Sequence, residues 1–361
     1  MAADRLLRPG SGIEEMVALS LLRLGPDTAA ARHFKELAES GAWSLGKLAD
    51  RLERRPGARA TLIQRARLLA GPALAEAARL GLSILTQPSP DYPDRLRQIP
   101  DPPIVLWVRG EREIVHGPAV AIVGSRSATP TGIAVSVRLG RELAEAGLVV
   151  VSGLARGIDG AAHRGALDAG GRTLGVLGSG VDVIYPREHA ALAEEMRARG
   201  AIVSELAPGT PPRAGHFPLR NRIISGLAHA VVVVEASERS GSLITARAAL
   251  EQGRDVLAVP GNVISGRHRG CHALIKDGAR LVETVDDVLD ELKWPRLATP
   301  EPAATLQLSG LEGTMAAGEP YSVDELAQAT GRPVHELLAE LGALEIAGRV
   351  ARRAGSVFVR T

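Results

Sequence analysis

The first segment that could do chemistry is a short turn of glycine and serine that carries an arginine. Gly124, Ser125 and Arg126 follow an apolar run, and Thr129 or Thr131 can cap the helix that comes next. Glycine permits a tight turn, and the arginine guanidinium can hold two oxygens of an oxyanion at once. The free N–H groups at a helix start also favour an anion. These residue types in this order predict a phosphate-binding loop.

A second segment of the same kind follows another apolar run. Ser152, Gly153 and Arg156 precede a helix, and Asp159 and His163 lie in its first turns. Two interpretations of Asp159 and His163 stay open: the pair contacts the ligand, or it only caps and packs the helix. The candidate phosphate-binding residues of this segment are Ser152, Gly153, Arg156 and His163.

The most basic segment also contains an aromatic residue. Arg213, Phe217, Arg220, Asn221 and Arg222 occur close together in the chain. A base can stack on an aromatic ring while arginines hold the sugar-phosphate backbone, which is how many proteins bind single strands without reading their sequence. The candidate residues here are Phe217, Arg220, Asn221 and Arg222.

A further turn is rich in hydroxyl groups and opens another helix. Ser240, Gly241, Ser242 and Thr245 offer hydroxyls and helix-start amides to an anion. Several such turns at one edge of a sheet would form a groove, and a groove suits a polymer of phosphates. Single-stranded DNA is therefore the predicted ligand.

Motifs for other chemistry are absent from the sequence. The turns match neither the dinucleotide fingerprint nor the nucleotide-triphosphate loop, and no zinc-protease or serine-hydrolase motif occurs. Cys271 is the single cysteine, so no intramolecular disulfide and no paired-cysteine metal site can form. We predict no cofactor, no metal and no catalytic residue.

The elements that must position these turns alternate between short apolar runs and amphipathic stretches, which predicts an α/β domain with a mostly parallel, Rossmann-like sheet covered by helices on both faces. The expected strands are Ile104–Val108, Ala119–Val123, Leu148–Ser152, Arg172–Leu177, Ala201–Ser204, Ala230–Glu235, Asp255–Val259 and Arg280–Glu283. The expected helices are Gly132–Ala146, Gly160–Ala169, His189–Arg199, Leu219–Gly226 and Ser242–Gln252. Ligands of such sheets bind at the carboxyl ends of the strands, where the turns lie.

Two smaller modules flank this domain. Residues 1–80 predict an all-helical module, either a plain bundle or a helix-hairpin-helix, and residues 81–293 form the α/β domain. A proline-rich stretch over 294–305 is a predicted linker, and residues 306–361 show helices followed by a β-hairpin, the pattern of a winged helix. The expected N-terminal helices are Ile13–Leu24, Thr28–Glu39, Ser44–Leu52, Ala60–Ala70 and Pro72–Leu80.

Composition narrows the possible partners. The net charge of the 361 residues is only +2, so affinity for nucleic acid must come from a local concentration of basic groups. No apolar run approaches the length of a membrane span, and the first residues do not form a secretion signal, so we expect a cytoplasmic protein.

Five ordered motifs resemble the DprA/Smf family of DNA-processing proteins. They are Gly-Ser-Arg (124–126), Ser-Gly-Leu-Ala-Arg-Gly-Ile-Asp-x-x-Ala-His (152–163), Phe-Pro-x-Arg-Asn-Arg-Ile-Ile-Ser-Gly (217–226), Ser-Gly-Ser-Leu-Ile-Thr-Ala (240–246) and Gly-Cys-His-x-Leu-Ile (270–275). The resemblance implies a protein of natural transformation that binds and protects incoming single-stranded DNA, helps to load the recombinase RecA and forms a homodimer through its α/β domain. The implied DNA site comprises Gly124, Ser125, Arg126, Phe217, the Arg220-Asn221-Arg222 run and the Ser240–Thr245 turn.

An enzyme is the alternative interpretation. Rossmann-like phosphoribohydrolases that act on nucleoside monophosphates carry Pro-Gly-Gly-x-Gly-Thr-x-x-Glu at a comparable strand-to-helix turn. The turn here reads Ser-Gly-Ser-Leu-Ile-Thr-Ala and lacks the catalytic-type glutamate. The sequence therefore favours a binding protein over this enzyme.

Overall fold

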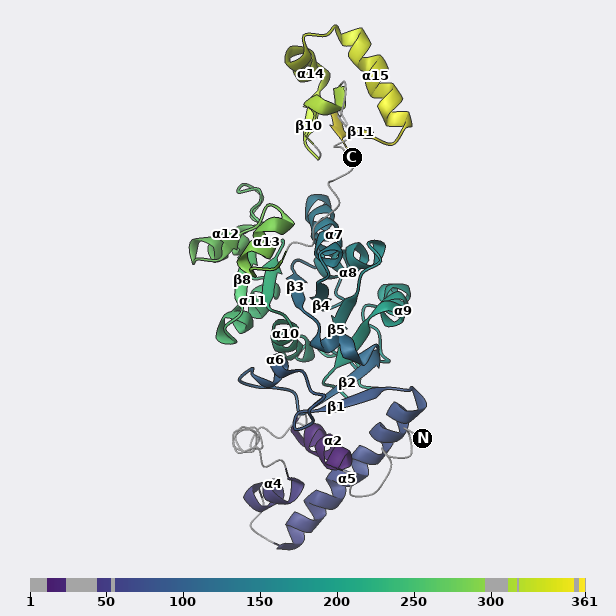
Figure 1. Cartoon of the computed structure of the whole chain (residues 1–361), viewed down its shortest axis with the longest axis vertical. Coiled ribbons are helices and arrows are strands. Elements are labelled where there is room, and N and C mark those ends of the chain that lie inside the picture. Colours follow the sequence, from purple (N-terminus) through teal and green to yellow (C-terminus); the bar gives the residue numbers. More distant parts are fainter. Residues whose placement is uncertain are drawn as a thin grey trace. The chain divides into compact units, whose positions relative to one another are not determined.

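A computed structural model describes residues 12–23, 44–52, 56–295, 311–316, 318–353 and 357–360 of the chain (Figure 1). The chain divides into two compact units, residues 1–295 and 296–361. The expected helix Thr28–Glu39 and most of the expected linker 294–305 lie outside the described residues.

A nine-stranded sheet forms the centre of the larger unit in the described chain, in the order β1-β2-β6-β5-β4-β3-β7-β8-β9. All neighbours from β6 to β9 are parallel, whereas β2 pairs antiparallel with both β1 and β6. The strands are β1 (Ser83–Thr86), β2 (Val105–Gly110), β3 (Ala119–Val123), β4 (Val149–Ser152), β5 (Thr173–Val176), β6 (Ala201–Ser204), β7 (Ala230–Val233), β8 (Asp255–Ala258) and β9 (Arg280–Leu281).

Helices cover both faces of this sheet, as the apolar strands predict. In β3, Val120 and Ile122 face one layer of helices, while Ala121 and Val123 face the other. Figure 1 shows α7 and α8 side by side in the first layer. The first layer contains α7 (Pro130–Glu145), α8 (Ile158–Asp168) and α13 (Val285–Glu291), and the second contains α6 (Asp94–Arg97), α10 (His216–Leu227), α11 (Ser242–Glu251) and α12 (Arg269–Lys276).

The direction of the chain through the sheet reverses beside β3. From β3 the chain proceeds through β4, β5 and β6 toward one edge, and then crosses back to β7, β8 and β9 on the other side of β3. Helix α9 (Ala190–Arg199) connects β5 to β6. In such sheets the carboxyl ends of the strands leave a crevice at the point of reversal, and ligands bind there. The turns after β3, β4, β5 and β7 all border this point.

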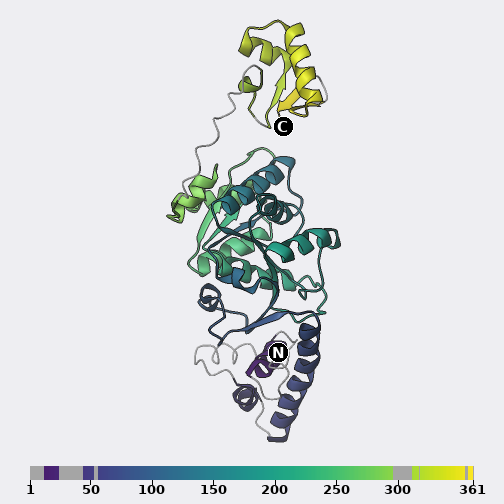
Figure 2. The ribbon, with the colours of Figure 1, turned by 45° about the vertical axis from the view of Figure 1, so that its right-hand side comes forward.

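Of the described N-terminal helices, the first contacts β1 and β2 at the edge of the sheet, and the other two pack on this helix (Figures 1 and 2). They are α2 (Gly12–Arg23), α4 (Leu45–Leu52) and α5 (Pro56–Arg79). The expected break at Gly71-Pro72 is wrong, because α5 runs through it with Pro72 inside the helix. Ala70 and Leu74, on either side, are buried in one apolar cluster with Leu19, and this packing offsets the lost backbone hydrogen bond.

In the described residues of the smaller unit, a three-stranded antiparallel sheet packs with two α-helices and a short 3-10 helix (Leu311–Thr314), consistent with the expected winged helix. Its elements are β10 (Pro320–Ser322), α14 (Val323–Thr330), α15 (Val334–Ile346), β11 (Val350–Arg353) and β12 (Val357–Arg360). Both β1 and β10 are additional to the predicted strands. In neither unit do the described residues include a helix with the length and hydropathy needed to cross a bilayer.

Candidate nucleic-acid-binding groove

A groove of about 690 Å³ lies at the point where the strand order reverses. Three arginines and, within the described chain, a single carboxylate line it. Its lining residues are Val123, Gly124, Ser125, Arg126, Ser127, Ala155, Asp159, Tyr185, Pro212, Arg213, Ala214, Phe217, Pro218, Arg220, Asn221, Ile224, Ser237, Ser240, Gly241, Ser242, Ile244 and Thr245. The groove therefore combines positive charge, hydroxyl groups and aromatic rings along one surface.

One of the exposed cations of the groove, Arg126, lies over an aromatic ring. The Arg126 guanidinium carbon is 5.0 Å from the centre of the Phe217 ring, and Tyr185 lies beside Phe217 at a centroid distance of 5.6 Å. Among the described residues, no carboxylate lies within ion-pair distance of Arg126. Its charge is therefore available to an anion, with two aromatic faces next to it.

The floor of the groove holds a buried arginine opposite a buried carboxylate. Arg220 Nη1 donates to the carbonyl oxygen of Val176 at 2.8 Å, at the end of β5. Burial lowers the pKa of Arg220 to about 10, while Asp159 acts in the opposite direction, so Arg220 stays charged at neutral pH. Burial raises the pKa of Asp159, and Arg220 acts against that rise. Each group thus partly offsets the cost of burying the other's charge.

Gly153 makes the floor possible. A side-chain carbon at this position would lie 1.6 Å from Arg220 Nη1, so only glycine leaves room for the guanidinium. The backbone N–H of Gly153 donates to Asp159 Oδ2 at 3.1 Å, and Ala155 N–H donates to the same oxygen at 3.4 Å. The loop after β4 therefore shapes the site through its backbone.

The first loop (residues 124–129) is fastened to the end of β7. The Ser125 N–H donates to the backbone oxygen of Glu235 at 2.7 Å. The Thr129 N–H and hydroxyl donate to Glu235 Oε2 at 3.0 and 2.6 Å, and the Thr129 hydroxyl accepts from the N–H of Gly132 as the N-cap of α7. Glu235 is buried and does not line the groove, so it positions the loop from behind.

The hydroxyl-rich turn before α11 lies on the same side. The hydroxyls of Ser240 and Ser242 are 2.7 Å apart, and Asn221 Nδ2 donates to the Gly241 carbonyl oxygen at 3.3 Å. This bond ties the basic helix α10 to the turn. Thr245, one helical turn further, completes this wall.

Ten of the predicted residues line the groove together. They come from three separate segments that the parallel sheet brings to one edge. These residues are Gly124, Ser125, Arg126, Phe217, Arg220, Asn221, Ser240, Gly241, Ser242 and Thr245.

The other five predicted residues lie outside the lining. The buried Ser152 hydroxyl donates to the carbonyl oxygen of Ile122 at 2.6 Å. Arg156 is exposed and pairs with Glu188 at 2.6 Å. Gly153, His163 and Arg222 make their contacts with other residues of the domain and do not face the groove. The residues outside the lining are Ser152, Gly153, Arg156, His163 and Arg222.

Arg222 is held in an internal ion pair. Its guanidinium donates both to Glu205, at 2.8 and 2.9 Å, and to Asp101, at 3.0 Å. Burial opposes the charge of Arg222, but Glu205 and Asp101 outweigh this effect and raise its pKa. The side chain therefore stabilises the contact of α10 with the sheet.

His163 packs inside the domain, which favours the second of the two interpretations of this residue. Its Nδ1 lies 2.6 Å from the Thr173 hydroxyl, which itself donates to the Val150 carbonyl oxygen. No part of the side chain is exposed, and burial lowers its pKa to about 3. His163 is therefore neutral in the folded protein.

This buried histidine predicts a loss of stability in acid. Below pH 6.5 the unfolded chain binds a proton at His163 that the folded chain takes up only near pH 3, so stability falls as the pH falls through this window. The contribution is at most about 1.4 kcal/mol per pH unit. Urea unfolding from pH 7 to pH 4 should show a shallower pH dependence for His163→Gln than for the wild type. Equal slopes would contradict this assignment.

Tyr185, Asp159 and Arg213 are groove residues that the sequence patterns do not assign to the site. Arg213 belongs to the basic segment. Asp159 does not cap α8 as the sequence suggested: it lies inside the first turn, after the N-cap Gly157, and accepts from the Gly153 and Ala155 N–H groups. Tyr185 carries no signal, because it lies in an irregular stretch far in sequence from Phe217. No group of three or more potential metal ligands occurs among the described side chains.

Comparisons with known proteins agree with these motifs. The family model described as DNA recombination-mediator protein A matches residues 83–293, and the model described as DprA winged helix domain matches residues 298–356. The DNA processing protein DprA of Streptococcus pneumoniae is 47% identical over 203 residues, which cover 56% of this chain and 72% of that protein. Protein Smf of Escherichia coli is 41% identical over 280 residues, or 74% of this chain and 75% of Smf.

Solved structures of related proteins share the fold. The X-ray structure of DNA processing protein A from Streptococcus pneumoniae superposes with a TM-score of 0.67 at 37% identity, covering 77% of this chain and 97% of that one. The structure of the same protein from Helicobacter pylori, reported for its single-stranded DNA binding mode, gives a TM-score of 0.53 at 29% identity, with coverage of 59% and 95%. With both family models and these relatives in agreement, the chain belongs to the DprA/Smf family of DNA-processing proteins.

Proposed function

We propose that the groove binds single-stranded DNA during DNA uptake, protects the strand and presents it to a recombinase. The observation that carries this proposal is the placement of Arg126 over Phe217, with Tyr185 beside the ring and Arg220 on the floor. Cations hold phosphates, and aromatic faces hold the bases of an unpaired strand. The Helicobacter pylori relative, whose structure concerns single-stranded DNA binding, supports the same ligand.

A binding role explains the groove better than catalysis does. Its one carboxylate among the described lining residues, Asp159, is buried and accepts two backbone N–H bonds, and it is therefore occupied as a structural acceptor. A phosphoribohydrolase would need an accessible acidic group beside the sugar. Incubation of the protein with AMP should release no adenine, and release at a rate that scales with enzyme would overturn this view.

The preference for single-stranded over double-stranded DNA is the central test of this proposal. Oligo-dT should bind more tightly than a duplex of the same length, because a duplex hides its base faces from Phe217 and Tyr185. The dissociation constant should rise steeply with salt, since each phosphate contact releases counterions. Fluorescence anisotropy at several salt concentrations measures both effects. Equal affinity for oligo-dT and the duplex would contradict the proposed contacts with bases.

The aromatic pair should contribute independently of charge. Phe217→Ala should weaken oligo-dT binding about five- to hundredfold, the value of one stacked base. The slope of affinity against salt should stay unchanged, because no phosphate contact is lost. Phe217→Tyr is the matched control, since it keeps an aromatic face at this position. A changed slope with an unchanged affinity at low salt would argue against stacking.

The wider assignments extend this proposal. We infer that the recombinase is RecA, that the protein acts as a homodimer through its α/β domain, and that it works in the cytoplasm, where a recombinase meets incoming DNA. We also propose the division into a helical module (1–80), the α/β domain (81–293), a linker (294–305) and a winged helix (306–361). Mass measurement of the free protein and of its mixture with RecA tests the first two inferences.

A further inference from the structure

The segment after β8 presents apolar side chains to solvent at the same edge of the sheet as the groove. Val263 is 74% exposed and Ile264 is 88% exposed, the two highest values among the large hydrophobic side chains of the described residues. Neither belongs to an apolar cluster of the fold. We call residues 262–267 the tip segment.

Polar contacts hold the tip segment in a defined shape without help from these two side chains. The Asn262 Oδ1 accepts from the N–H of Ile264 at 2.7 Å and from the N–H of Ser265 at 3.3 Å. The Arg267 N–H donates to the Ser265 hydroxyl at 3.4 Å. Because backbone and polar side chains form the turn, folding does not require β-branched apolar residues at its apex.

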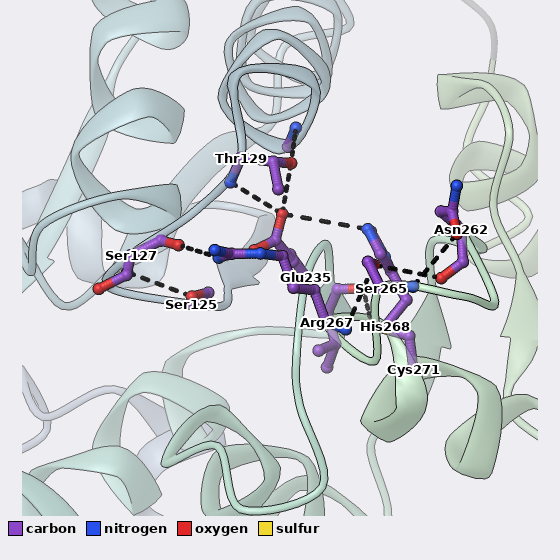
Figure 3. A network of polar contacts seen from close by, with 12 residues as sticks. Ser125, Ser127, Thr129, Glu235, Asn262, Ser265, Arg267, His268 and Cys271 are labelled. Carbon is purple, nitrogen blue, oxygen red and sulfur yellow. Dashed lines mark hydrogen bonds and ion pairs between the residues drawn. The ribbon is translucent and has the colours of Figure 1, made fainter.

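The tip segment is also joined to the groove. Arg267 Nη1 donates to the Ser127 carbonyl oxygen at 2.9 Å, and Ser127 lines the groove. Figure 3 shows Arg267 between Ser127 and Ser265, with His268 directed toward the Glu235 carboxylate, 4.0 Å away. Glu235 holds the Arg126 loop from behind, so the same network positions both the loop and the tip segment.

The charges near the tip are mostly positive. Arg239 and Arg267 are exposed, and the exposed Arg269 pairs with Glu238 at 3.5 Å. An apolar apex with cations around it and a phosphate groove beside it matches a partner that carries both negative charge and flat apolar surfaces. Unpaired nucleotides have this chemistry, and apolar side chains that wedge against bases are a known form of contact.

We propose that the tip segment extends the nucleic-acid-binding surface beyond the groove, with Val263 and Ile264 in contact with unpaired bases of a strand whose backbone lies against Arg126. This inference rests on the proposed binding of single-stranded DNA. It adds a second base-contact site, of aliphatic character, to the aromatic pair in the groove.

The test compares the full-length wild type with the double variant Val263→Ser/Ile264→Ser on oligo-dT of about four and about sixteen nucleotides, the range of site sizes for single-strand binders. Affinity for the longer strand should fall about three- to tenfold, as expected when two exposed apolar side chains lose their burial. Affinity for the shorter strand and the salt slope should not change, because no ionic contact is lost. Leu250→Ser, an exposed position on α11, is the matched control.

An abasic strand of the longer length isolates the base contact. The wild type and the double variant should bind it equally, because it offers no bases to the tip. Equal binding of the longer oligo-dT by both proteins would overturn the inference while leaving the groove intact. If the double variant also changed from dimer to monomer, the tip would instead cover a second copy of the chain. A wild type that binds neither oligo-dT would overturn the proposed function as well.

Discussion

Arg126→Ala should weaken the binding of oligo-dT about ten- to hundredfold, the value of one charge-assisted hydrogen bond to phosphate. Arg126 is exposed in the groove, and no carboxylate of the described residues lies within ion-pair distance of it, so its charge is not already neutralised. The slope of log affinity against log salt should fall by about one, because one fewer phosphate is contacted. Anisotropy titrations between low and physiological salt measure both quantities. Stability should hardly change, since the side chain is exposed.

Two variants make this experiment specific. Arg126→Lys keeps the charge and should recover most of the salt slope, but only part of the affinity, since a lysine cannot form the paired bonds of a guanidinium. Arg141→Ala removes an exposed arginine from α7, outside the groove, and should leave affinity unchanged. An equal loss of oligo-dT affinity in the Arg126 and Arg141 variants would mean that only the overall charge of the protein matters. The groove would then not be the binding site.

The groove can be located from the sequence because its signals are short-range. Glycine, serine and arginine directly after an apolar strand mark a turn at the carboxyl end of that strand, and parallel topology brings such turns together. Gly124, Arg126 and Ser240 can therefore be assigned to one edge from the residue pattern alone, and all three line the groove.

Residues whose roles depend on distant partners cannot be assigned in this way. Arg222 follows Asn221 directly, yet Asn221 lines the groove while Arg222 pairs with Asp101 and Glu205, which lie far away in the chain. A helix turns successive side chains by about 100°, so neighbours in sequence face different surroundings. Local pattern reveals the basic helix, and only packing decides which of its cations reach the ligand.

The same limit explains the differences in the fold. The short edge strand β1 carries no alternating pattern, and it exists as a strand through its antiparallel pairing with β2, in which Ser83 lies opposite Val108. Helix α5 continues through Gly71-Pro72 because the residues on both sides are buried against α2. In both cases a tertiary contact outweighs the local preference of the chain.

Arg220→Met should damage both stability and DNA binding. The methionine removes the positive charge that opposes the desolvation of the buried Asp159, and leaving a buried charge without compensation costs about 3 to 5 kcal/mol. Since Arg220 opposes the rise in the pKa of Asp159, its loss raises that pKa further. A raised pKa stabilises the protonated folded form, so the deficit should grow as the pH rises. Urea unfolding over a series of pH values measures the deficit.

Two comparisons separate the structural part of this effect from the binding part. Arg220→Met/Asp159→Asn has no buried charge to compensate, so it should regain much of the stability while oligo-dT affinity stays low. Arg222→Met breaks an ion pair with Glu205 that lies outside the groove. It should lower the free energy of unfolding and leave the affinity of the folded protein unchanged. If the double variant regained affinity along with stability, Arg220 would serve the groove only by neutralising Asp159, and direct contact between its guanidinium and phosphate would have to be given up.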